Sequence, residues 1–313
     1  MKIGIVGYRR HARKHIDLIK KNYKNNQLVI FHPTFKSKEV SNNFSDLMKC
    51  DCLIISSPTS THLEYIKKLS EYNYKMPIYL EKPGFNSIKE SYELEKLQSK
   101  FSLNITFGYH FPYESKIKKI KEIISSQDTG KIISIDLLLA KGISYSNWFQ
   151  DDWRKQDKLA VAHTGLSHLL SIYYFLIDND FYQKINSKVF FNNDTESFDN
   201  ALAFSIEDKP ILKAIFSWGS PLIKLKIQIL TTNKLINLDE DNLEVRSPRD
   251  VFDINGNYVE PNITYSKKFK SEGIKPSMHA FFAASKNKNK FNSDLFQKGL
   301  KIGRICHSAE IIK

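Results

Sequence analysis

The chain has 313 residues, of which 41% are hydrophobic and 26% charged, a composition that suits a globular protein with room for two domains. Its apolar runs are far shorter than the ~20 residues that span a bilayer, and no signal peptide precedes the first strand pattern, so we expect a cytoplasmic protein without a membrane partner. Three cysteines without metal-finger spacing predict neither a disulfide framework nor a metal site.

The formal net charge of +13 raises the possibility of a nucleic-acid binder. The lysines are scattered among asparagines along the whole chain instead of forming one stripe. We therefore favour a basic enzyme with no nucleic-acid partner, whose positive field draws an anionic substrate or cofactor toward a cleft. A salt-dependent gel shift would expose the alternative.

The first 112 residues alternate between β-branched runs and amphipathic helical spacing. This alternation predicts an α/β fold with a doubly wound parallel sheet, a Rossmann domain over residues 1–112. The expected strands are 2–6, 28–31, 52–56, 76–80 and 102–108, and the expected helices are 11–21, 44–48, 61–71 and 88–97.

Strands dominate after Pro112, which predicts a second, α+β domain over residues 113–313, built on a largely antiparallel open sheet. Few helices are available to cover that sheet, so we expect a homodimer or homotetramer to cover one face. The expected helices are 113–125, 165–177 and 294–311, the expected strands are 132–139, 188–191, 201–206, 212–218 and 224–230, and residues 284–290 are expected to form a loop.

A turn that follows the first strand is similar to the dinucleotide-binding pattern Gly-x-Gly-x-x-Gly. The first glycine is present, and alanine takes the last position. Arginine replaces the middle glycine, where its side chain either crowds a pyrophosphate or swings out and pairs with it. A plain turn without a ligand is the alternative. The candidate cofactor-binding residues here are Gly7, Tyr8, Arg9, Arg10, His11 and Ala12.

Two further strand ends carry polar residues. His32 stands where an acid usually holds the ribose hydroxyls, and Lys36 could pair with a 2′-phosphate, which favours NADP over NAD. Small hydroxyl residues then follow the strand 52–56, where they could bind ribose and phosphates or simply cap the next helix. The candidates in this run are Ser57, Pro58, Thr59 and His62.

Glu81-Lys82-Pro83 closes the strand 76–80, at the edge where open α/β sheets bind ligands. A lysine in a partly desolvated cleft can donate or accept a proton, and the proline fixes the backbone beside it. A solvated lysine before a turn is the alternative interpretation.

The order of these motifs, Gly7 turn, Ser57-Pro58-Thr59-x-x-His62 and Glu81-Lys82-Pro83, resembles the glucose–fructose oxidoreductase and inositol dehydrogenase (Gfo/Idh/MocA) family of NAD(P)-dependent oxidoreductases, which act mostly on sugars and cyclitols. The resemblance implies that Lys82 is the catalytic or substrate-orienting lysine and that Glu81 and Pro83 shape the cofactor pocket.

The family's second-domain motif Asp-x-Gly-x-His is similar to Thr164-Gly165-Leu166-Ser167-His168, which implies a catalytic His168. The aspartate position is Thr164 and the glycine position is Leu166. The resemblance places Trp153 and Arg154 near the substrate, and His110, His163 and Thr164 are further candidate substrate contacts. The alternatives are that His110 is a hinge residue and that aromatic side chains such as Trp153 only pack against the protein.

Alcohol oxidation removes a hydroxyl proton while a hydride leaves. A histidine can act as the general base that takes the proton, and a protonated lysine stabilises the negative charge that develops on the oxygen. The sequence therefore predicts an NAD(P)-dependent dehydrogenase of a sugar-like, perhaps nucleotide-linked, secondary alcohol, with Lys82 and His168 as its catalytic pair. The alternatives are a core histidine at position 168 and, for the whole protein, an inactive sensor or regulator on the same fold, which the residues at Arg9, His32, Thr164 and Leu166 motivate.

Overall fold

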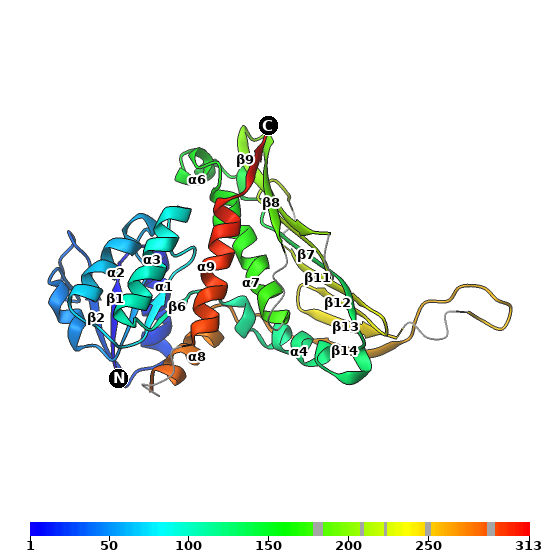
Figure 1. The fold of residues 1–313 in the computed structure, drawn as a ribbon, viewed down its shortest axis with the longest axis horizontal. Coiled ribbons are helices and arrows are strands. Elements are labelled where there is room, and N and C mark those ends of the chain that lie inside the picture. Colours follow the sequence, from blue (N-terminus) through cyan, green and yellow to red (C-terminus); the bar gives the residue numbers. More distant parts are fainter. Residues whose placement is uncertain (178–183, 207–209, 222–223, 248–251, 287–291) are drawn as a thin grey trace. The chain divides into compact units, whose positions relative to one another are not determined.

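A computed structural model describes residues 1–177, 184–206, 210–221, 224–247, 252–286 and 292–313. The chain divides into two compact units (Figure 1). The first comprises Met1–His110 and Ile274–Arg304, and the second comprises Phe111–Gly273 and Ile305–Lys313. The segment Ile274–Arg304, which we had expected in the second part of the chain, therefore packs with the first. Independent folding of two domains with a boundary at residue 112 stays a prediction.

The first unit contains a six-stranded sheet in the order β3-β2-β1-β4-β5-β6, and every neighbouring pair is parallel, as the sequence predicted. The strands are β1 (Lys2–Val6), β2 (Gln27–Phe31), β3 (Val40–Ser41), β4 (Cys52–Ile55), β5 (Ile78–Leu80) and β6 (Ile105–Phe107). The helices are α1 (Arg10–Asn22), α2 (His62–Glu71), α3 (Ile88–Phe101), α8 (Lys275–Lys286) and most of α9 (Ser293–His307), and Phe44–Lys49 form a 3₁₀ helix.

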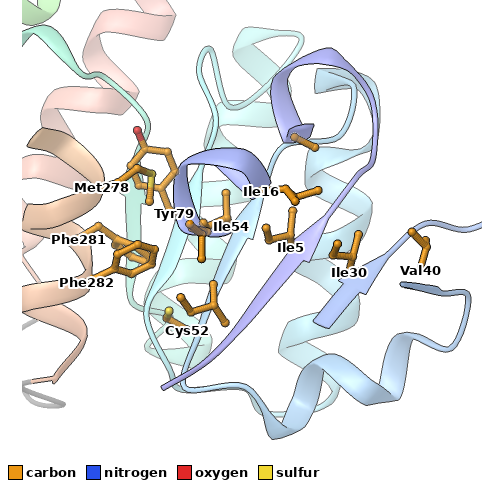
Figure 2. Packing of buried hydrophobic residues seen from close by; sticks show 13 residues of the cluster. Ile5, Ile16, Ile30, Val40, Cys52, Ile54, Tyr79, Met278, Phe281 and Phe282 are labelled. Atoms are coloured by element: carbon orange, nitrogen blue, oxygen red, sulfur yellow. The ribbon is translucent and has the colours of Figure 1, made fainter. Parts of the chain in front are cut away.

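One face of this sheet is covered by α1 and α8 (Figure 2). Helix α1 presents an apolar stripe that includes Ala12, Ile16 and Ile19, all of them buried. Met278, Phe281 and Phe282 of α8 pack into the same cluster, although about 250 residues separate the end of α1 from the start of α8. This apolar contact is the physical reason why the C-terminal segment belongs to the first unit.

The second unit contains a nine-stranded sheet in the order β14-β13-β12-β11-β7-β10-β9-β8-β15. All neighbouring pairs are antiparallel except β7 with β10 and β8 with β15. The prediction of a largely antiparallel sheet is confirmed. Its strands are β7 (Ile132–Ala140), β8 (Asn186–Asn192), β9 (Ser197–Ser205), β10 (Ile211–Ser217), β11 (Lys224–Thr231), β12 (Leu235–Asp239), β13 (Asn242–Arg246), β14 (Ile263–Lys268) and β15 (Glu310–Ile312).

Alternation along these strands turns one face inward, where α7 (Ser167–Leu176) contacts β7 and β10 and packs against α4 (Ser115–Ile124). Among the described residues, side chains on the other face such as Leu138, Ile211 and Leu230 are exposed, and we call this the open face. Two short helices, α5 (Asn147–Gln150) and α6 (Trp153–Gln156), follow β7. No helix in the described ranges is long and apolar enough to cross a membrane.

Three local expectations were wrong. The predicted last helix over 294–311 ends at His307, and Glu310–Ile312 form β15 beside β8 because strand pairing there satisfies the backbone. The predicted loop 284–290 begins inside α8, which continues to Lys286, and its residues 287–290 lie outside the described part of the chain. The strands β12 to β14 were not predicted, because the many polar residues in these segments leave no continuous apolar run of the kind that indicates a strand.

Candidate cofactor and active site

The turn between β1 and α1 requires a glycine. Gly7 has a φ of +114°, a conformation that side chains rarely adopt, and its N–H donates to the Phe31 carbonyl at 2.9 Å. A Cβ at this position would lie 2.8 Å from the Ser56 carbonyl oxygen. The glycine therefore lets the carboxyl ends of β1, β2 and β4 approach one another.

Helix α1 begins next to this turn without a side-chain cap. Arg9 is its N-cap residue, with extended backbone and no capping hydrogen bond, and no acidic residue lies in the first turn. The first backbone N–H groups of such a helix suit an anion such as a pyrophosphate. The side chains of Arg9 and Arg10 are exposed, so the arginine at the middle glycine position does not fill the turn.

A pocket of about 210 Å³ opens at this edge of the sheet. One arginine, one histidine and several hydroxyl groups line it, and no carboxylate does. Ser56 contributes a buried hydroxyl that has no hydrogen-bond partner within the described residues. A buried hydroxyl of this kind is able to form a hydrogen bond with a bound ligand. The lining residues are Gly7, Tyr8, Arg9, His32, Pro33, Thr34, Ser56, Ser57, Pro58, Thr61 and Tyr65.

His32 organises the loop after β2. Its Nδ1 accepts the backbone N–H of Phe35 at 3.0 Å, so a proton on Nε2 makes the other side of the ring a donor. Lys36 is exposed and does not line the pocket.

The hydroxyl run after β4 is held by hydrogen bonds among its own residues. Thr61 Oγ1 donates to Ser57 Oγ at 2.8 Å, and His62 Nε2 donates to the Ser57 carbonyl at 3.0 Å. His62 is buried, and this burial lowers its pKa, with the bond to Ser57 opposing the shift. His62 thus lies behind the loop and positions it, while Ser57, Pro58 and Thr61 line the pocket.

Glu81 follows β5, and its carboxylate Oε1 lies 2.7 Å from His15 Nε2 on α1. Burial alone raises the pKa of Glu81, but the hydrogen bond and charge of His15, aided by His11 and Lys82, lower this pKa to about 2. The carboxylate is therefore ionised. Next to it, Gly108 leaves space, since a Cβ there would come within 3.2 Å of Glu81 Oε2.

His15 is a site residue that the sequence reasoning missed. Because His15 lies on the buried apolar stripe of α1, its position in the sequence predicts a packing residue. The available signal was a histidine among aliphatic side chains, because a buried imidazole needs a polar partner. Tyr65 was missed as well, although it lines the pocket.

In the second unit, His163, Thr164 and His168 lie on one continuous helical segment. Residues Ala162–Leu166 form a π-helical turn that runs into α7. Such turns occur often at functional sites. Gly165 allows Phe216 to pack directly on this turn, since a Cβ would lie 2.0 Å from its ring. His168 is buried and meets the Phe111 ring edge-on, at 5.3 Å between centroids.

The His163 ring lies against His307, with ring centroids 4.0 Å apart and the ring planes tilted by 46°, and His163 Nδ1 lies 4.0 Å from Asp157 Oδ2. Thr164 donates its hydroxyl to the Ala160 carbonyl at 2.7 Å. The side chains of these two candidate substrate residues therefore have partners within the second unit.

Arg154 lies over the Trp153 ring, 4.9 Å from its centroid, and donates to Asp152 at 2.7 Å. Trp153 is exposed, and its contact with a substrate stays a prediction. His110 is half-buried at the last position of the first unit.

The candidate cofactor residues all belong to the first unit. Those that line the pocket are Gly7, Tyr8, Arg9, His32, Ser57 and Pro58. Those that do not line it are Arg10, His11, Ala12, Thr59, His62, Glu81 and Lys82. Lys82 belongs to the first unit, and His168 belongs to the second. Their meeting at one substrate stays a prediction. In the part of the chain that the structure describes, no group of three or more His, Cys, Asp or Glu side chains could hold a metal ion.

No family model matches the sequence. The chain is 24% identical over 250 residues to glucose-6-phosphate 3-dehydrogenase of Bacillus subtilis, an alignment that covers 74% of this chain and 67% of that protein. An oxidoreductase from Agrobacterium radiobacter, solved in complex with NAD⁺, L-tartaric acid and magnesium, superposes with a TM-score of 0.76 at 15% identity and covers 99% of this chain and 95% of its own. The transcriptional regulator Gal80p of Kluyveromyces lactis superposes with a TM-score of 0.78 at 16% identity, over 98% of this chain and 88% of its own.

A parallel sheet with a glycine turn, an uncapped helix and an open pocket at its carboxyl edge defines a dinucleotide-binding fold. With its second, mixed sheet and its sequence similarity to a sugar dehydrogenase, the chain resembles the NAD(P)-dependent oxidoreductases of the Gfo/Idh/MocA type.

Proposed function

We propose that this protein oxidises a secondary alcohol of a sugar derivative, or reduces the matching ketone, with a nicotinamide dinucleotide. The observation that carries the proposal is the pocket beside Gly7, which is lined by Ser56 and by Arg9, the N-cap residue of α1 that has no side-chain cap. When bound, the dinucleotide supplies the hydride acceptor.

The chain's own residues would then manage the proton. His168 would take the hydroxyl proton as the carbon–oxygen double bond forms, and Lys82 would stabilise the negative charge that develops on the same oxygen. The ion pair of Glu81 with His15 fixes the start of the segment that carries Lys82. Each of these steps rests on the predicted pairing of Lys82 and His168.

The substrate class follows from two observations. The relative from Bacillus subtilis is named for a phosphorylated hexose, and this chain carries a net charge of +13, which attracts anions. We therefore propose a phosphorylated or nucleotide-linked sugar as substrate.

Turnover with a panel of such sugars tests the proposal, using the wild type, Lys82→Ala and His168→Ala. We expect each substitution to lower kcat by about 10² or more. Lys89→Ala and His279→Ala, which change the same residue types at exposed positions, should leave kcat unchanged. Equal activity in all five proteins would remove Lys82 and His168 from the mechanism.

For the cofactor, we propose NADP in preference to NAD. The pocket offers Arg9 and a donor on His32, and no lining carboxylate repels a 2′-phosphate. Calorimetric titration should give a tighter Kd for NADPH than for NADH, and His32→Asp should reverse the order. The tartrate-complexed oxidoreductase of the same fold, by contrast, was solved with NAD⁺.

A second candidate is a sensor that binds the dinucleotide without turnover. The departure at Arg9 favours it, and so does the fold similarity to a transcriptional regulator. Binding of NADPH together with no turnover on any sugar of the panel would favour this role. We also propose that a second copy of the chain covers the open face of the nine-stranded sheet.

A further inference from the structure

The second sheet has a carboxyl edge of its own, where β7 and β10 end side by side. These two strands run parallel, and Ala140, the last residue of β7, pairs with Ser217, the last residue of β10. The residues that follow the two strands therefore lie together, as they do at the ligand-binding edge of an open parallel sheet. Lys141 is the first residue after β7, and it is half-buried.

The loop that begins at Lys141 is fixed against the segment after β10. The Lys141 N–H donates to the Ser217 carbonyl at 2.9 Å. Gly142 takes a φ of +56°, and a Cβ there would lie 2.5 Å from the Ser220 carbonyl oxygen, so the loop requires a glycine directly after the lysine. Ser144 contributes a buried hydroxyl with no partner within the described residues, and such a group can bond a ligand or a water.

The Phe216 ring connects Lys141 to the π-helical turn Ala162–Leu166. Lys141 Nζ lies over this ring, 5.9 Å from its centroid. The same ring packs on Gly165, where a Cβ would lie 2.0 Å from it. Phe216 is fully buried in a packed core, so its ring has little freedom to move away from these neighbours. The ammonium group and the turn that carries the candidate substrate residue Thr164 therefore lie against one ring.

The charges in this part of the second unit favour an anionic ligand at Lys141. Contact with an aromatic ring attracts an ammonium group without cancelling its charge. Arg154, by contrast, donates two hydrogen bonds to the Asp152 carboxylate, at 2.7 and 2.9 Å, which offset its charge. An ammonium group binds phosphate as a compact point charge on a flexible stem. Lys141 therefore suits a phosphate group better than the neutral hydroxyls of a plain sugar.

We propose that Lys141 binds a phosphate group of the substrate and thereby selects phosphorylated sugars over neutral ones. The inference rests on the proposed function, and it adds a specificity-determining residue in the second unit. Either a sugar monophosphate or the diphosphate of a nucleotide-linked sugar supplies such a group, and the choice of probes distinguishes the two sources.

Calorimetric titration of the NADPH-bound protein tests the contact without turnover, because the reduced cofactor cannot oxidise the sugar. The probes are glucose 6-phosphate, UDP-glucose and glucose. We expect one phosphate-bearing sugar to bind more tightly than glucose, and the tighter of the two identifies the source of the phosphate. Lys141→Met, which keeps an aliphatic stem, should weaken this binding by about tenfold or more, and Lys141→Arg, which keeps the charge, should retain most of it.

Lys267→Met is the matched control. Lys267 also lies over a ring of the second unit, 4.9 Å from the Phe269 centroid, but it belongs to β14, and β13, β12 and β11 separate that strand from β7. This variant should bind every probe as the wild type does. Equal affinities in the wild type and Lys141→Met, an equal loss in Lys267→Met, or no binding of either phosphate-bearing sugar overturns the proposal.

Turnover separates this inference from the proposed function. On a phosphorylated sugar that reacts, Lys141→Met should raise KM by about tenfold and leave kcat within about twofold, because the contact binds ground state and transition state alike. Binding that depends on Lys141 without any turnover would contradict the proposed reaction and support the phosphate site. Turnover with an unchanged KM in Lys141→Met would overturn the phosphate site and leave the proposed reaction in place.

Discussion

Removing the His15 imidazole should leave the Glu81 carboxylate buried without its partner. Only 12% of the Glu81 side chain is exposed, and its pKa lies at about 2 compared with an ordinary value of 4.5. Lowering the pKa from 4.5 to about 2 corresponds to roughly 3–4 kcal/mol of stability, since a tenfold change in the acid constant is worth ~1.4 kcal/mol. Breaking a buried pair from one side costs about 3–5 kcal/mol, which agrees with this figure.

We therefore expect His15→Ala to lower the free energy of unfolding by about 3 kcal/mol at pH 7, measured by urea denaturation. The effect should depend on pH. Because the pKa of Glu81 is lower in the folded state, its contribution is complete above pH 4.5 and is lost as the pH falls toward 2. The difference between wild type and variant should shrink over this interval.

A double-mutant cycle isolates the pair. Glu81→Gln in the His15→Ala background should recover part of the loss, since an amide is cheaper to bury than a carboxylate. Glu39→Gln, which breaks the exposed pair of Lys20 with Glu39, should change the free energy of unfolding by less than about 1 kcal/mol. A His15→Ala protein as stable as the wild type at pH 7, or additive effects in the cycle, would refute the reasoning.

Two further predictions concern the same unit. Gly7→Ala should destabilise the protein by about 1–3 kcal/mol and weaken NADPH binding by at least tenfold in calorimetry, because its Cβ meets the Ser56 carbonyl. The control Gly256→Ala, at a positive φ with open space around it, should leave the NADPH affinity unchanged. An equal loss of affinity in both variants would contradict a role of the Gly7 turn in binding the cofactor. Phe282→Ala should lower the free energy of unfolding by about 3–5 kcal/mol in urea denaturation, since the residue is only 3% exposed in the α1–α8 cluster. The control Tyr92→Ala, at an exposed position, should lower the free energy of unfolding far less. Similar decreases in both variants would show that α8 is not part of this core.

The sequence alone was enough to predict five of the six strands of the first sheet, all except β3. The strands β4 and β5 are buried along their whole length, and β1 is buried at all but its first residue. These strands are short and apolar, and each is followed by a turn or helix signal, so local pattern determines them. Gly7, Ser57 and Pro58 could be assigned to a pocket for the same reason, because residues just after parallel strands meet at one edge of a sheet.

Only the tertiary structure decided the contacts between distant segments. His15 meets Glu81 across 66 positions, α8 returns to cover α1, and Glu310–Ile312 pair with β8. No local periodicity encodes such partners, because the free energy of each contact depends on where the rest of the chain has placed the other side. A histidine on an apolar stripe has the same local pattern whether it packs or pairs, and the fold alone brings the carboxylate that distinguishes the two.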